Sequence, residues 1–265
     1  MATSSLFDSQ RYPLDRADGS AYRQLLQDCW AGLEARGAAV LEGFLPAPIL
    51  ARILEEVRPA LPKAFYKEKR HSPYLIADDP AFPDDHPRNR KQRTNSATLG
   101  YADLPSDCAL DRLYRDPAFV AFLAEVLGYP TLFPYADSLT PVNVLLYEPG
   151  QELGWHFDVS TFVVTLALSE AEQGGAFEYV PFLRSEEAEN FDSVGRVLDG
   201  AAKDQVCELK QGAGALVIFR GSRTLHRVSR IEGSRARMMA VFSYAPKPGT
   251  YSDPHNLKTF YGRTS

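Results

Sequence analysis

From residue 142 to residue 246 the sequence is a series of short runs rich in β-branched and aromatic residues, separated by Gly, Pro and charged turns. The runs are "VNVLLYEPGQELGWHFD", "TFVVTLAL", "GGAFEYVPFL", "QVCELKQGAGALVIFRG", "TLHRVSRIEG" and "RARMMAVFSYAP". Many short strands at regular spacing are typical of a β-sandwich or barrel. We therefore predict a mainly β protein with flanking helices (α+β), whose core is a jelly roll over residues 135–247.

The sequence before this core reads mostly as helix. Apolar residues recur at helical spacing over 22–33 and over 49–57, and Gly37 is placed to end the first of these helices. A third helix is predicted between Asp116, a suitable N-cap residue, and Gly128. The run "AAVLEGFLP" between the first two helices reads as a short strand.

Residues 70–100, between the second and third predicted helices, are rich in Pro, Asp and Arg. A loop this long in a compact domain is typically functional or disordered, and it could close over a site as a lid. With 45% hydrophobic residues the chain can bury a full core. We expect one domain over 1–265, with a helical elaboration and lid loop over 1–134 and a C-terminal tail over 248–265.

Charge and cysteine content limit the function classes. A formal net charge of -5 argues against a general binder of nucleic acid or membrane surfaces, and the basic run 88–93 is interpreted as a solvated loop. Neither a signal sequence nor an apolar stretch long enough to span a bilayer is present. The cysteines Cys29, Cys108 and Cys207 lack CxxC spacing, so we expect reduced thiols and a cytoplasmic location.

The stretch "GWHFD" places His156 and Asp158 two residues apart at the head of an apolar segment. In a strand, residues i and i+2 face the same way, so both side chains would point into one space. His226 lies in another apolar run, "TLHRVSR", which a jelly roll can fold back to the first. Two imidazoles and one carboxylate on one face of a metal suit non-haem Fe(II). Alternatively, the carboxylate simply holds a buried imidazole in the core.

Two arginines and a tyrosine suggest that a carboxylate ligand binds nearby. Arg235 and Arg237 follow His226 at short range, and Tyr147 precedes His156 across a Pro-Gly turn. A guanidinium is costly to bury alone and is well suited to bidentate recognition of a carboxylate. The hydroxyl of Tyr147 could share that ligand.

Together, the HxD motif, the distal "HRV" and the following Gly and Arg resemble the iron(II)/2-oxoglutarate-dependent dioxygenase superfamily. Residues 70–247, with "DDHPRN", "ELGWHFD", "FVVTLAL", "GGAFEYVP" and "LHRVSRIEG", are similar to the bacterial group typified by the amino-acid halogenase BesD, which also contains free-amino-acid hydroxylases. The resemblance implies a double-stranded β-helix and three cofactors or co-substrates, Fe(II), 2-oxoglutarate and O2.

The resemblance also implies residue roles. His156, Asp158 and His226 would hold the iron, and an Arg on a late core strand would bind the 5-carboxylate of 2-oxoglutarate. Arg235 matches that position best. Arg237 is the alternative, since the gap after the distal His varies between family members. Tyr147 matches a common helper residue.

One position bears on the type of reaction. In halogenases of the BesD type a Gly replaces the carboxylate of HxD and leaves a coordination site for chloride, whereas this sequence has Asp158. The resemblance therefore implies hydroxylation of an unactivated C–H bond rather than halogenation. Desaturation or ring closure by the same oxidant stays open.

The substrate implied by the resemblance is a small molecule, a free amino acid. Its ammonium would pair with Asp137, its carboxylate with Arg88 or Ser243, and His71 in the long loop would also face it. Val159 stands where the lysine-using halogenase has an acid, which favours an uncharged side chain. Two alternatives are a hydroxylase of protein-bound or carrier-bound residues and a non-catalytic metal-binding sensor.

Overall fold

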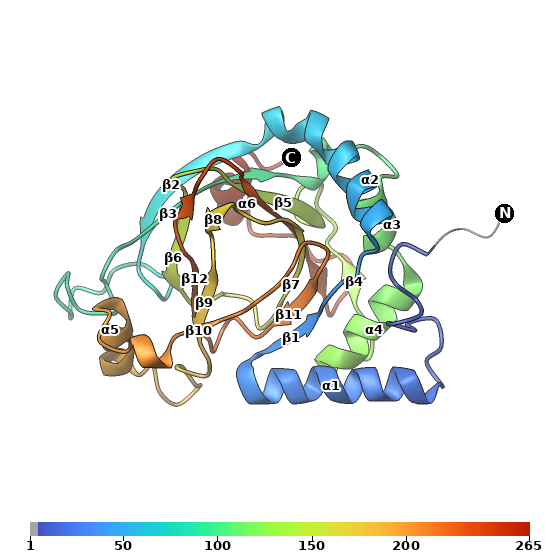
Figure 1. Cartoon of the computed structure of the whole chain (residues 1–265). Coiled ribbons are helices and arrows are strands. Elements are labelled where there is room, and N and C mark those ends of the chain that lie inside the picture. Colours follow the sequence, from blue (N-terminus) through green and yellow to red (C-terminus); the bar gives the residue numbers. More distant parts are fainter. Residues whose placement is uncertain (1–4) are drawn as a thin grey trace.

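The computed structural model describes residues 5–265, and eleven of its strands form one antiparallel sheet that curls on itself (Figure 1). Neighbouring strands in this sheet follow the order β1-β11-β7-β14-β5-β3-β6-β12-β9-β10, with β2 paired to β3. The strands are β1 (Ala38–Leu41), β2 (Phe65–His71), β3 (Gln92–Leu99), β5 (Val142–Tyr147), β6 (Glu152–His156), β7 (Val163–Ser169), β9 (Phe177–Val180), β10 (Cys207–Glu208), β11 (Leu216–Phe219), β12 (Leu225–Val228) and β14 (Arg237–Phe242). The predicted mainly β architecture with flanking helices is confirmed.

Short strand pairs and helices complete the chain. Two small sheets pair β4 (Phe133–Pro134) with β15 (Tyr244–Ala245) and β8 (Gln173–Gly174) with β13 (Ile231–Glu232). The helices are α1 (Ser20–Arg36), α2 (Ala47–Val57), α3 (Ala109–Tyr114), α4 (Pro117–Leu127), α5 (Phe191–Leu198) and α6 (Pro254–Tyr261), with 3-10 turns η1 (Arg58–Lys63), η2 (Tyr101–Asp103) and η3 (Lys203–Gln205). Within residues 5–265, no helix has both the length and the apolar character needed to cross a membrane.

The two faces of the sheet bury different groups. On the outer face, Val144 of β5, Leu166 of β7 and Ala240 of β14 belong to the largest apolar cluster, together with buried residues of α1, α2 and α4. Helices α1 to α4 accordingly lie along one side of the curled sheet, and α5 lies across from them (Figure 1). Because side chains alternate along a strand, neighbours such as Leu145 and Tyr147 face the interior.

The three predicted helices and the predicted strands after residue 140 are confirmed. The helix caps are local, which explains the agreement: Asp116 accepts hydrogen bonds from the backbone N–H groups of Ala118 and Phe119 at the start of α4. Gly128 ends the same helix with a φ of 74°, a conformation that a glycine adopts without strain. The helices α3, α5 and α6 were not predicted.

The prediction of a continuous loop over residues 70–100 was wrong for its last third. Residues 92–99 form β3, which lies inside the sheet and pairs with β2, β5 and β6. The strand was missed because Thr94, Ser96 and Thr98 alternate with the residues that face outward, so its inner face carries no apolar pattern. The loop itself covers residues 72–91, and the sheet includes strands from both sides of residue 135.

Candidate metal centre

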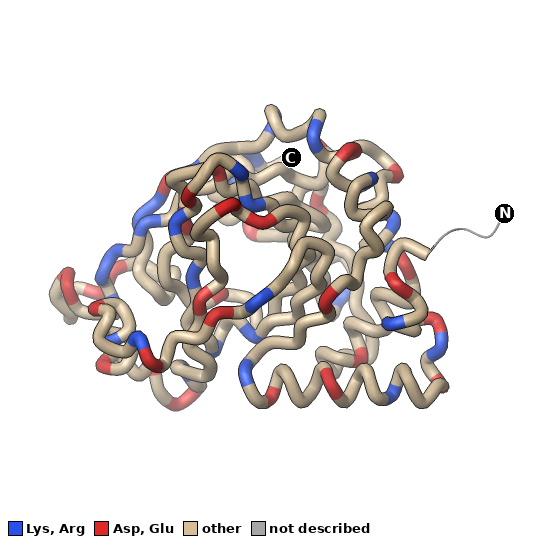
Figure 2. Tube along the Cα trace, in the orientation of Figure 1, with Lys and Arg blue, Asp and Glu red and all other residues tan. Residues whose placement is uncertain are grey.

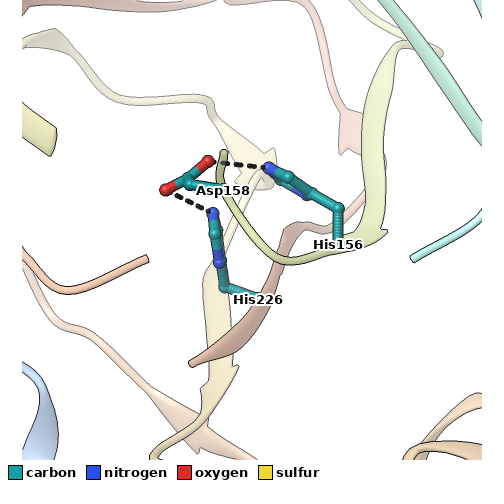
Figure 3. Close-up of side chains that lie close together, drawn as sticks. All are labelled: His156, Asp158 and His226. Carbon is teal, nitrogen blue, oxygen red and sulfur yellow. Dashed lines mark ion pairs between the residues drawn. The ribbon is translucent and has the colours of Figure 1, made fainter. Parts of the chain in front are cut away.

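Three ionisable side chains meet on the inner face of the sheet, at the ends of β6 and β12 (Figure 3). His156 and His226 are directly opposite each other in the β6–β12 pairing, with ring centroids 4.1 Å apart. Asp158 lies two residues past the end of β6, and its carboxylate oxygens are 3.4 Å from Nε2 of each histidine. One ligand atom from each residue lies within 4.8 Å of the other two. The structure therefore brings together the three residues that the sequence singled out.

The orientation of both imidazoles fits a bound cation. Nδ1 of His156 is 2.9 Å from the Gly154 carbonyl oxygen, and Nδ1 of His226 is 2.9 Å from that of Thr224. Since a carbonyl oxygen only accepts, both Nδ1 atoms carry a proton and donate it. In the neutral rings both Nε2 atoms then present lone pairs toward the oxygens of Asp158. The Nε2 lone pairs and the carboxylate oxygens repel each other. A divalent metal bound among the three groups would accept all of them as ligands and remove this repulsion.

Burial and mutual proximity keep the histidine and the carboxylate in their metal-binding forms. Burial lowers the pKa of His156, and the neighbouring His226 lowers it further, which favours the neutral ring. Burial alone would raise the pKa of Asp158, but His226 and His156 outweigh it and hold this pKa well below its usual range. Neutral imidazole and ionised carboxylate are the forms that bind metal.

A β-bulge in β6 turns His156 toward the interior. His226 and Val228 are two residues apart on β12, but their partners on β6, His156 and Leu153, are three apart. The extra residue shifts the alternation of side chains along the strand, so Leu153 and His156 both face inward. Trp155 faces the other way and packs in a second apolar cluster with residues of α5. Bulges of this kind commonly redirect a side chain beside an active site.

Polar contacts from β2 and β3 hold this bulge. The backbone N–H of Gly154 donates to Oγ1 of Thr94 at 3.0 Å, and the Thr94 hydroxyl donates to Nε2 of His71 at 2.7 Å. His71 in turn donates from Nδ1 to the Ser72 carbonyl oxygen at 3.0 Å, and burial lowers its pKa to about 4. The His71 ring lies edge-on to that of His156, with centroids 6.0 Å apart. His71 is thus placed beside the metal centre, as a support for its geometry.

Two further features surround the centre, and Gly221 and Phe177 were missed from the sequence. The Asp158 N–H donates to the carbonyl oxygen of Gly221 at 3.0 Å, and a Cβ at Gly221 would lie 1.7 Å from Oδ2 of Asp158. Phe219 and Phe177 place their rings 4.9 Å and 5.4 Å from the ring of His226. The "FRG" turn before His226 was the available signal for Gly221, but a single Gly in a turn has many ordinary explanations.

A buried arginine and a buried tyrosine lie on the same inner wall. Arg237 begins β14 directly opposite Tyr147 on β5, and its guanidinium carbon is 6.0 Å from the Tyr147 ring centroid. Arg237 is 6% exposed, and among the described residues its side chain has neither a hydrogen bond nor an ion pair. Burial lowers its pKa, and burial raises the pKa of Tyr147 to about 12. An unpaired buried guanidinium of this kind favours an anionic ligand.

Arg235, the arginine preferred on spacing, is placed differently. It precedes β14 and is exposed, and its guanidinium donates to the carbonyl oxygens of Glu170 and Ala171. Arg235 therefore has its hydrogen-bond partners on the surface, whereas Arg237 has none in the interior. The spacing after His226 could not separate the two arginines, because the first residue of β14 was not defined by sequence pattern.

The other predicted substrate residues do not converge on the centre through any contact in the structure. The carboxylate of Asp137 is buried and accepts hydrogen bonds from the backbone N–H groups of Leu139, Thr140 and Ser252. Its oxygens therefore organise the turn before β5.

Arg88, Ser243 and Val159 have different surroundings. Arg88 donates to the carbonyl oxygen of Ala77 within the loop 72–91. Ser243 follows β14 and is partly buried, and its carbonyl accepts a hydrogen bond from the Tyr114 hydroxyl. Val159 directly follows Asp158 and is 81% exposed, so it lies at the open edge of the centre.

Comparisons with known proteins agree with this fold. The sequence profile of the family described as Halogenase D matches residues 88–258. No curated protein matches the chain.

Solved structures with the same fold include a 2OG-Fe(II) oxygenase family oxidoreductase from Burkholderia pseudomallei, at 15% identity and a TM-score of 0.55, covering 85% of this chain and 92% of that one. The α-ketoglutarate-dependent epimerase SnoN from nogalamycin biosynthesis is similar at 19% identity and a TM-score of 0.57, over 88% of this chain and 93% of that one. HygX from Streptomyces hygroscopicus, solved with nickel, 2-oxoglutarate and hygromycin B, is similar at 15% identity and a TM-score of 0.55, over 86% and 89% of the two chains.

Proposed function

This chain belongs to the Halogenase D family and has the fold of 2OG-Fe(II) oxygenases, and on that premise we propose that it is an Fe(II)- and 2-oxoglutarate-dependent hydroxylase of a small substrate. The observation that carries the proposal is the arrangement of two Nε2 lone pairs and one carboxylate around a common point. Such a set leaves one side of a metal open, as the non-haem iron oxygenases require.

Each residue of the inner wall has a role in this proposal. His156, Asp158 and His226 would hold iron(II), and Arg237, with the Tyr147 hydroxyl beside it, would bind the 5-carboxylate of 2-oxoglutarate. Bound iron(II) and 2-oxoglutarate would supply the oxidising chemistry, in which O2 is consumed and succinate and carbon dioxide are released. Our preference for Arg237 over Arg235 rests on its burial and on its lack of a partner among residues 5–265.

The protein residues around the centre would orient the ligands and exclude water. The carbonyl groups that accept the Nδ1 protons of the two histidines fix which nitrogen can bind metal. Phe177 and Phe219 shield one side of His226, which limits access of water to the reacting atoms.

Asp158 supports hydroxylation as the outcome. Its carboxylate occupies the space next to Gly221 and faces both histidines, so it takes the place that a halide would need in a halogenase of the family. The substrate radical would then receive oxygen rather than chlorine. In this proposal the chain is related to the halogenases of its family, but its own reaction inserts oxygen.

We propose a free amino acid as the substrate, taken up by a single domain that spans residues 1–265. The support is the match of residues 88–258 to the Halogenase D family. A cytoplasmic setting is consistent with Cys29, Cys108 and Cys207, all of which are free.

The test is a substrate screen with two readouts. The protein is loaded with Fe(II) and 2-oxoglutarate without oxygen and then exposed to air with each free amino acid in turn, and succinate and product mass are measured. One amino acid should stimulate succinate formation and gain the mass of a single oxygen atom. A chlorinated product in chloride buffer would refute the hydroxylase assignment, and no succinate formation with any amino acid would favour a sensor or a tethered substrate.

A further inference from the structure

Strand β2 carries two lysines, Lys67 and Lys69, on the same inner face as His71. We propose that Lys67 and Lys69 form a subsite for a carboxylate of the substrate, beside the metal centre. This inference rests on the proposed function, because it names the chemistry of a molecule that the oxygenase would oxidise.

Strand pairing shows which way the lysines face. Lys67 is directly opposite Ser96 of β3, and Lys69 is opposite Thr94. Residues directly opposite in an antiparallel pair have their side chains on the same face of the sheet. Thr94 contacts His71, and the His71 ring lies against that of His156. The wall that bears the two lysines is therefore continuous with the metal centre.

A second chain of pairings leads to the same face. Thr98 of β3 is opposite Leu145 of β5, and Leu145 packs in the interior cluster with Tyr147. Ser96 and Thr98 lie two residues apart on β3 and thus share this interior side. The inner surface of β2 and β3 is consequently polar and basic, while the opposite side of β3 contributes Leu99 to the outer apolar core.

The two lysines lack anionic partners, unlike Arg93 of the same hairpin. Among the described residues, neither Lys67 nor Lys69 has a carboxylate within ion-pair distance or a side-chain hydrogen bond. On the outer side, by contrast, Arg93 pairs with Glu68 and Glu152. Figure 2 shows how basic residues gather along the β2–β3 hairpin.

The surroundings of Lys67 leave its ammonium group poorly compensated. Its Nζ lies 3.6 Å from the centroid of the Phe260 ring on α6, a cation–π contact that offsets only part of the desolvation. Burial, together with the smaller effect of the charge of Lys69, lowers the pKa of Lys67 to about 7. The hydroxyl of Thr98 on the same face is buried and has no hydrogen-bond partner among residues 5–265. Both observations are explained by a ligand that brings negative charge and acceptor oxygens.

Charge balance points to the substrate as the source of that negative charge. In the proposed complex, Arg237 and the metal would neutralise the two carboxylates of 2-oxoglutarate, and Asp158 would be engaged at the metal. The two lysines remain, and no acidic side chain of residues 5–265 lies within ion-pair distance of them. A carboxylate group of the substrate would place negative charge locally beside these lysines, and a carboxamide group in its place would not.

The spacing suits a small amino acid. Along β2, Lys69 is two residues and Lys67 four residues from His71, or about 7 Å and about 13 Å along the strand. A carboxylate held by Lys69, with Lys67 behind it, would leave a side-chain carbon of the same molecule within reach of the metal centre. This subsite replaces Arg88 and Ser243 as the expected carboxylate anchor.

The experiment measures binding without turnover. Wild-type protein with Ni(II) and 2-oxoglutarate is screened by thermal shift against the free amino acids and the carboxamide of each, and the best ligand is titrated by calorimetry. The same titration is run on Lys67→Met, Lys69→Met and Arg70→Met. Arg70 lies on the same strand but on its outer face, so Arg70→Met is the matched control.

We expect the acid to bind at least tenfold more tightly than its carboxamide, because one charge-assisted contact is lost. Lys67→Met and Lys69→Met should each weaken binding of the acid about tenfold or more, and Arg70→Met should leave it unchanged. Equal binding of acid and carboxamide would overturn the proposal, as would unchanged affinity in both lysine variants or no binding of any carboxylate.

A separate readout distinguishes this proposal from the proposed function. The visible charge-transfer band of Fe(II) with 2-oxoglutarate should form in both lysine variants as in the wild type. A normal band with unimpaired acid binding in the variants would contradict the lysine subsite alone. Absence of the band in the wild type would contradict the proposed function, and the calorimetric comparison would still decide the subsite.

Discussion

Replacing Arg237 by Met should weaken binding of 2-oxoglutarate while leaving the unliganded protein as stable as before. The guanidinium is 6% exposed and unpaired among the described residues, so its full hydrogen-bonding capacity is available to a ligand. Breaking a buried charge pair costs at least about 3 kcal/mol. At about 1.4 kcal/mol per tenfold change in affinity, this corresponds to a loss of roughly 150-fold.

The same change removes a desolvated charge that nothing compensates in the unliganded protein. Methionine has a similar length and no charge, so the melting temperature without ligand should stay the same or rise by a few degrees, given that about 1 kcal/mol shifts the melting temperature by roughly 2–4 °C in a protein of this size. Loss of ligand affinity together with retained stability would identify Arg237 as a binding residue rather than a structural one.

The assay is an anaerobic titration of the Fe(II)-loaded protein with 2-oxoglutarate, followed by the visible charge-transfer band. Arg235→Met is the control, because Arg235 is exposed and its hydrogen bonds go to backbone carbonyls. It should change the affinity for 2-oxoglutarate by less than about twofold, since surface substitutions are usually near neutral. Wild-type affinity for 2-oxoglutarate in Arg237→Met would contradict the assignment of Arg237, and a large loss of affinity in Arg235→Met would transfer the role to Arg235.

Three further changes test other parts of the structure. Gly221→Ala should lower metal affinity at least tenfold, measured by calorimetry, because its Cβ would lie 1.7 Å from Oδ2 of Asp158; Gly212→Ala, with nothing closer than 3.5 Å, should be neutral. Thr94→Val should lower stability by about 1–2 kcal/mol in urea unfolding, because it leaves the partly buried backbone N–H of Gly154 without its acceptor; an unchanged midpoint would argue against the bulge support. The pKa of Lys67 is about 7 in the folded protein and 10.5 by its ordinary value. Between these two pH values the unfolded chain binds more protons than the folded protein, so the stability of the wild type rises with pH. The stability gained in Lys67→Met over the wild type should therefore be largest below pH 7 and shrink toward pH 10, and a gain that grows with pH would contradict this sign.

The parts of the fold that could be predicted from the sequence depend on local signals. The cap residues Asp116 and Gly128 act within one helical turn, so α4 was located correctly. The strand β3 was missed because its inner residues are polar, and they are polar because they line the interior beside the metal centre. Strand prediction from alternating apolar residues therefore fails for a strand whose inner residues are polar and line a binding site.

The metal ligands could be predicted because two of them lie close together in the sequence and the third in a strand that pairs directly with the first. The prediction placed His156 and Asp158 on one straight strand, whereas β6 has a bulge and ends at His156, and Asp158 is oriented by its hydrogen bond to the Gly221 carbonyl. The supporting contact from Thr94 joins residues sixty positions apart, which no local pattern reveals.

The most direct test of the account is anaerobic addition of Fe(II) and then 2-oxoglutarate to the wild type and to Asp158→Ala, followed by admission of air. The wild type should bind one Fe(II), develop the visible charge-transfer band only when 2-oxoglutarate is present, and form succinate after air is admitted. Asp158→Ala should lose metal affinity and succinate formation while keeping its fold by circular dichroism. Near wild-type succinate formation in Asp158→Ala, or no band in the wild type, would contradict the assignment of the metal centre.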